Sequence, residues 1–125
     1  MKPKEHPISI IRGDFFYESF RVRHTVWQQA YNDGLGGWAP GPYRDLTGWT
    51  GVFTVSTTQN SADVLRSGNV QILNQNTHPG GVQFSMEDEI TTLLPAGILF
   101  YRVRLIDLED RTVTFLYGPA TVMAV

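Results

Sequence analysis

The chain contains no cysteine, and this absence excludes several kinds of protein. Without thiols there are no disulfides, no thiolate metal sites and no cysteine nucleophile. An excess of positive charge is also missing, because ten Lys and Arg face twelve Asp and Glu, for a formal net charge of -2. Nucleic acid is bound chiefly through basic surfaces, so we expect no nucleic-acid partner.

Long apolar runs are absent as well. No stretch approaches the ~20 apolar residues that a membrane helix requires, and no apolar signal segment follows the N-terminus. We therefore expect a soluble protein made in the cytoplasm, without a membrane partner. The 125 residues, of which 42% are hydrophobic, are sufficient for one domain with one continuous core.

Apolar and polar residues alternate along most of the chain, as they do in half-buried β-strands. The apolar members of these alternations include Ile8, Ile10, Phe16, Phe20, Val22, Phe53, Val55, Val70, Ile72, Val82, Phe84 and Met86. The longest pattern predicts a hairpin from Ile98 to Tyr117, after which Gly118-Pro119 should bend or break the strand before a short edge segment. About seven or eight short strands favour a single antiparallel β-sandwich over a barrel or a helical fold.

The one helical pattern is brief and ends at Pro95. Ser85 is placed to cap it, and acidic residues follow where a helix dipole favours negative charge. Ile90, Leu93 and Leu94 share one face. We expect a short helical turn that closes one end of the sandwich with its leucines.

No residue pattern predicts catalysis. The histidines His6, His24 and His78 lack the spacing that places two imidazoles on one metal ion, and no serine lies in a nucleophile elbow. The sequence therefore predicts a protein that is not an enzyme and that has no catalytic residue, metal or cofactor. The tripeptide Arg12-Gly13-Asp14 matches an integrin-binding motif, but we interpret it as a tight turn in which Gly13 supplies the backbone freedom.

Residues 28–48 form a Gly/Pro-rich loop longer than hairpin loops usually are. The loop carries Tyr31, Leu35, Trp38 and Tyr43. Aromatic side chains of this kind can anchor a protein partner, fold back as a lid over the open end of the sandwich, or stack on a sugar ring. Protein contact is the interpretation we prefer for these four residues, and the other two stay open.

Five turn-like motifs follow one another in the sequence. They are Ile11-Arg12-Gly13-Asp14-Phe15, Asp45-Leu46-Thr47-Gly48-Trp49, Gly80-Gly81-Val82, Leu94-Pro95-Ala96-Gly97 and the hairpin turn around Asp107 to Thr112. In this order, over about residues 8–122, they resemble the small β-sandwich structural proteins of tailed bacteriophages.

The resemblance implies an Ig-like or closely related sandwich that serves as a building block of the virion, in the tail, baseplate, fibre attachment region or capsid surface. It also implies that the partners are other virion proteins and copies of the same chain. Residues 28–44 depart from the family pattern, which makes them the expected place for a contact particular to this protein. A carbohydrate-binding module that recognises a host-surface glycan through the loop aromatics is the alternative.

Overall fold

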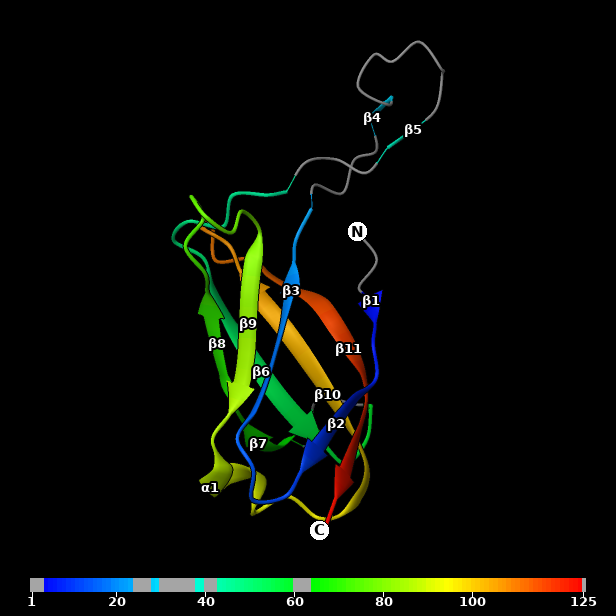
Figure 1. Cartoon of the computed structure of the whole chain (residues 1–125). Helices are drawn as coiled ribbons and strands as arrows, with labels where there is room; N and C mark the ends of the chain where they lie inside the picture. The colour runs from blue at the N-terminus through cyan, green and yellow to red at the C-terminus, as the bar shows by residue number, and fades with distance from the viewer. Residues whose placement is uncertain (1–3, 24–27, 30–37, 40–42, 60–63, 125) are drawn as a thin grey trace.

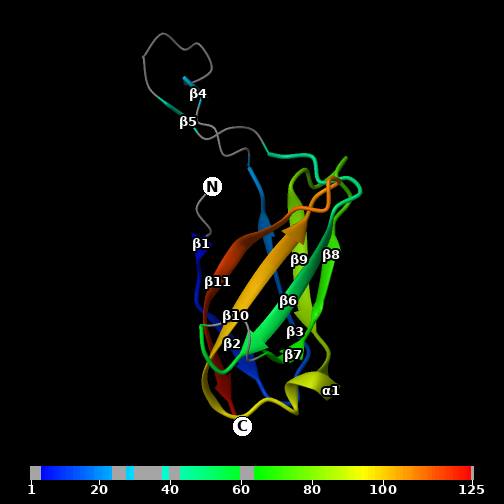
Figure 2. The ribbon, with the colours of Figure 1, turned by 180° about the vertical axis from the view of Figure 1, so that it is seen from behind.

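Two β-sheets packed face to face make up the body of the protein (Figures 1 and 2). The computed structural model describes residues 4–23, 28–29, 38–39, 43–59 and 64–124. The larger sheet has the order β1-β11-β10-β6-β7, with β2 also paired to β11, the smaller has the order β3-β9-β8, and β4 and β5 pair separately. The elements are β1 (Lys4–Glu5), β2 (Ile8–Ile11), β3 (Phe16–Arg21), β4 (Gln28–Gln29), β5 (Trp38–Ala39), β6 (Thr50–Ser56), β7 (Val64–Ser67), β8 (Asn69–Ile72), β9 (Gly81–Met86), α1 (Asp88–Thr91), β10 (Gly97–Ile106) and β11 (Thr112–Met123).

Aromatic side chains from both sheets meet in the core. Phe84 of β9 lies with its ring centroid 5.0 Å from that of Phe53 on β6 and 6.0 Å from that of Tyr101 on β10. All three are buried, as the alternation predicts for inward positions. The prediction of an all-β, two-sheet fold is confirmed.

Strand direction departs from the expectation in one place. The hairpin of β10 and β11 and the pairing of β8 with β9 are antiparallel, as predicted. However, β1 and β2 both run parallel to β11, so the sheets are not wholly antiparallel. Alternation identifies the buried face of a strand and carries no information on the direction of its neighbour.

The expected break at Gly118-Pro119 is wrong, because β11 runs through both residues and lies inside the sheet. On one side Pro119 is paired with Phe100 of β10. On the other side the N-terminal segment changes from β1 to β2 opposite this point, so neither of these two strands has a residue paired with Pro119. His6 N donates to the Tyr117 carbonyl at 2.8 Å, and Pro119, two residues further, has its nitrogen on the same side. The N–H that proline lacks would therefore point at the gap between β1 and β2, where the sheet has no hydrogen bond to lose.

Helix α1 is a single short turn of four residues, as expected, but its cap and one of its leucines differ from the prediction. Its N-cap is Glu87 without a side-chain cap, while Ser85 lies within β9. Leu94 is fully buried, but Leu93 is 55% exposed. The buried Thr91 hydroxyl donates to the Asp14 carbonyl at 2.8 Å and accepts from Gly13 N at 3.1 Å, which joins α1 to the β2–β3 turn. No helix in the described part of the chain is long and apolar enough to cross a membrane.

Candidate functional site

The loop at 28–48 is the site that the sequence favoured. Tyr31 and Leu35 lie outside the described residues. Trp38 belongs to β5, whose backbone pairs with β4 in the register Gln29↔Trp38, so the segment contains a short antiparallel ladder of its own. Sequence alternation gave no sign of this ladder, because two residues are too few to show a period.

Tyr43 lies against the end of β3. The Cζ atoms of Arg21 and Arg23 are 3.6 and 4.0 Å from the centroid of its ring. Arg23 Nη2 also donates to the Tyr43 hydroxyl at 2.8 Å. Guanidinium groups at this distance attract the ring electrostatically. The half-buried Tyr43 thus packs against Arg21 and Arg23 of its own chain.

Titratable side chains are dispersed over the described ranges, which contain no group of three His, Asp or Glu that could hold a metal ion. His6 Nε2 lies 2.9 Å from Glu18 Oε1, and His78 Nδ1 lies 2.9 Å from the Thr77 hydroxyl. His24 is outside the described residues. Each described imidazole thus has a local partner.

Two pKa shifts have structural causes. Burial raises the pKa of the Tyr101 phenol, and the negative charge of Glu18 raises it further. The Tyr101 hydroxyl donates to the His6 carbonyl and so holds the N-terminal segment on the core. At the β10–β11 turn the Arg111 backbone N–H lowers the pKa of the Asp107 carboxyl, which accepts from that N–H at 2.9 Å.

The flank of the sandwich between β2 and β3 is open. These strands belong to different sheets and are not paired with each other, so within the described part of the chain β3 has a free edge on this side (Figure 1). A groove of about 370 Å³ runs between them. Three large apolar side chains on this flank are exposed, at 37% for Ile11, 51% for Phe15 and 62% for Tyr17. We call these three residues the lateral seam.

Within the lateral seam, the two aromatic side chains are already stacked on each other. The rings of Phe15 and Tyr17 stack with their centroids 5.9 Å apart. Our sequence reasoning missed both residues. The signal was present, because Phe15 and Tyr17 are aromatic residues at odd-numbered positions on either side of Phe16, whereas the even-numbered positions of β3 are the half-buried ones.

No protein-family model matches the chain, and no curated protein matches it either. The class of the molecule is therefore defined by its own structure, as an all-β protein of two packed sheets with one apolar open flank.

Proposed function

We propose that this protein is a non-enzymatic structural component of a tailed-bacteriophage virion. In this proposal it is an Ig-like β-sandwich, made in the host cytoplasm, that assembles with copies of itself or with other virion proteins. The five ordered sequence motifs support the virion role, and they are spread over about residues 8–122 of the chain. The lateral seam supports assembly.

The order of the strands supports the Ig-like part of the proposal. Variable-type immunoglobulin domains place strands B, E and D in one sheet and G, F, C and C′ in the other. Here β3-β9-β8 and β11-β10-β6-β7 follow that order. Helix α1 joins β9 to β10, which correspond to E and F.

The observation that carries the assembly proposal is the exposure of Phe15 and Tyr17 beside the free edge of β3. An unpaired strand edge offers backbone donors and acceptors to another chain, and natural proteins usually protect such edges with charge, proline or cover. Clustered exposed apolar side chains mark contact sites in the same way. A partner strand or loop seated along the lateral seam would bury the ring pair and satisfy the edge.

Loop residues Tyr31, Leu35 and Trp38 remain proposed contacts of the same assembly. Tyr43 has a supporting role in this proposal, because its ring is held by Arg21 and Arg23 and anchors the end of the loop to β3.

The assembly proposal is tested by measuring molar mass in solution across a concentration series, together with detection of the protein in intact particles by mass spectrometry. Tyr17→Asp places a charge in the lateral seam, so it should weaken self-association about tenfold or more. The matched control is Leu108→Asp, which changes an apolar side chain that is 72% exposed in the β10–β11 turn.

We expect the control to associate like the unchanged protein and Tyr17→Asp to be largely monomeric or absent from particles. A protein that is monomeric at every concentration and absent from particles would overturn the proposal. If Tyr17→Asp and Leu108→Asp associate equally well, the lateral seam is not the assembly contact.

A further inference from the structure

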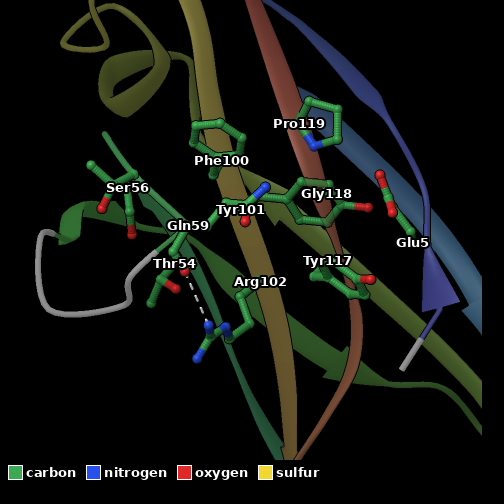
Figure 3. A pocket seen from close by; sticks show the side chains of 11 residues that line it. Glu5, Thr54, Ser56, Gln59, Phe100, Tyr101, Arg102, Tyr117, Gly118 and Pro119 are labelled. Atoms are coloured by element: carbon green, nitrogen blue, oxygen red, sulfur yellow. Dashed lines mark hydrogen bonds between the residues drawn. The ribbon is translucent and has the colours of Figure 1, made fainter. Parts of the chain in front are cut away.

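The outer face of the larger sheet carries a hollow of about 170 Å³ that lies apart from the lateral seam (Figure 3). Four strands and the start of the β6–β7 loop contribute to it. The side chains that surround it are mostly outward-facing, and Figure 3 shows them converging from β6 on one side and from β1 and β11 on the other. The backbone at Tyr101 and Gly118, a directly paired position, contributes to its floor.

Strand register arranges the lining in two rows. In the first row Phe100 of β10 stands between Ser56 of β6 and Pro119 of β11. In the second row Arg102 stands between Thr54 and Tyr117, and Glu5 of β1 pairs with Tyr117 at the end of the row. The hollow therefore has rings on two sides and polar groups around them.

Two hydroxyl-bearing residues in the hollow are more buried than outward-facing strand positions usually are. Thr54 and Ser56 are only 8% and 5% exposed. Across the described ranges neither side chain takes part in a hydrogen bond. Both hydroxyl oxygens still reach the surface, because no fully buried side-chain oxygen of the described residues lacks a partner. Both hydroxyls can therefore bond to a ligand that enters the hollow. Arg102 Nη2 donates to the Gln59 carbonyl at 3.3 Å, which holds the guanidinium at the rim.

We propose that this hollow binds one neutral hexose unit of a glycan. A sugar ring has an apolar face of C–H groups and a rim of hydroxyls. The rings of Phe100 and Tyr117 fit the apolar face, while Thr54, Ser56 and Arg102 fit the hydroxyls. A volume of about 170 Å³ suits a single ring rather than a drug-sized ligand.

The charges in the hollow favour a neutral sugar over an anion or a lipid chain. Among the described residues that line it, the one cation is Arg102, and the carboxylate of Glu5 lies on the opposite side. A phosphate group would therefore gain little net attraction. A hydrocarbon chain would cover the Thr54 and Ser56 hydroxyls without bonding them, which costs free energy.

The test uses the whole protein on a glycan array and in NMR titrations with glucose, galactose, mannose, rhamnose and N-acetylglucosamine. Phe100→Ala removes a ring and should weaken binding of the best ligand about tenfold or more. Thr54→Val keeps the side-chain shape and removes one hydroxyl, so it should weaken binding about fivefold to tenfold without unfolding the sheet. The matched control is Ile98→Ala, on the same strand and face and 67% exposed, which should change affinity less than about twofold.

The proposal is supported when a neutral sugar shifts the amides of β6, β10 and β11 and both hollow variants lose affinity while the control does not. It is overturned when no sugar or glycan binds, when binding survives Thr54→Val and Phe100→Ala unchanged, or when the shifted amides lie in residues 28–48 instead. Preferential binding of a phosphate, a peptide or a lipid at the hollow also overturns it. These readouts do not depend on assembly, so a negative result leaves the virion role as it stands.

Discussion

Replacing either of two adjacent leucines by alanine gives the sharpest check on the packing of this sandwich. Leu94 and Leu93 follow one another after α1, and the helical pattern predicted that both would close the end of the core. The structure separates them, since Leu94 is fully buried and Leu93 is 55% exposed. The same chemical change at neighbouring positions should therefore destabilise the protein strongly at Leu94 and very little at Leu93.

The magnitude follows from burial. Leu94 belongs to the main core cluster, against which Phe16 and Ile90 also pack. Truncating a fully buried leucine leaves a cavity and costs about 2.7–5 kcal/mol, whereas exposed substitutions usually stay within about 0.5 kcal/mol. For a domain of this size, 1 kcal/mol corresponds to roughly 3–5 °C in Tm. Leu94→Ala should lower Tm by about 8–25 °C, and Leu93→Ala by no more than about 2.5 °C.

Urea unfolding followed by tryptophan fluorescence and thermal melts followed by circular dichroism measure both changes. Unfolding should be compared at equal protein concentration, because association stabilises the folded state. Similar losses in the two variants, or a loss below about 1 kcal/mol for Leu94→Ala, would refute the assignment of inner and outer sides at this end of the sandwich.

Two further predictions concern the ladder and the hairpin turn. A Cβ on Gly118, where φ is +152°, would lie 2.8 Å from the His6 carbonyl oxygen, whereas one on Gly97, at φ +128°, would meet nothing within 4 Å. Gly118→Ala should therefore lower the free energy of unfolding in urea by about 1–2 kcal/mol more than Gly97→Ala does. It should also speed hydrogen exchange of the His6 amide. Equal losses in the two variants would contradict the close approach of the N-terminal segment to Gly118. Asp107 has a lowered pKa, so its contribution to stability is present above about pH 4 and is lost as pH falls through the folded pKa. Asp107→Asn should flatten the fall of Tm between about pH 4 and pH 2, and an unchanged slope would show that other groups control acid unfolding.

Much of the fold was readable from local patterns. The two-residue period identified the inward faces of Ile8, Ile10 and Phe84, all of them buried. Turn residues marked the β10–β11 hairpin, and the glycine of the Arg12-Gly13-Asp14 turn has the positive φ, +87°, that the sequence suggested. These features depend on residues within a few positions of each other, so they can be predicted from the local sequence pattern.

The candidate surfaces were less accessible to sequence reasoning. Loop aromatics drew attention because they stand out in composition. Phe15 and Tyr17, by contrast, matter only because none of the described strands pairs with β3 on their side. The hollow has no local signal at all, since its rows join β1, β6, β10 and β11 through register.

The amino-acid order alone determined that this is an all-β chain without thiol chemistry, and which side of most strands is apolar. Tertiary structure decided that β1 and β2 run parallel to β11, and that a bulge opposite Val103 and Arg104 turns both Phe115 and Leu116 inward. The reason is physical: alternation is a property of one strand, whereas direction, register and exposed edges arise from contacts between residues far apart in the chain.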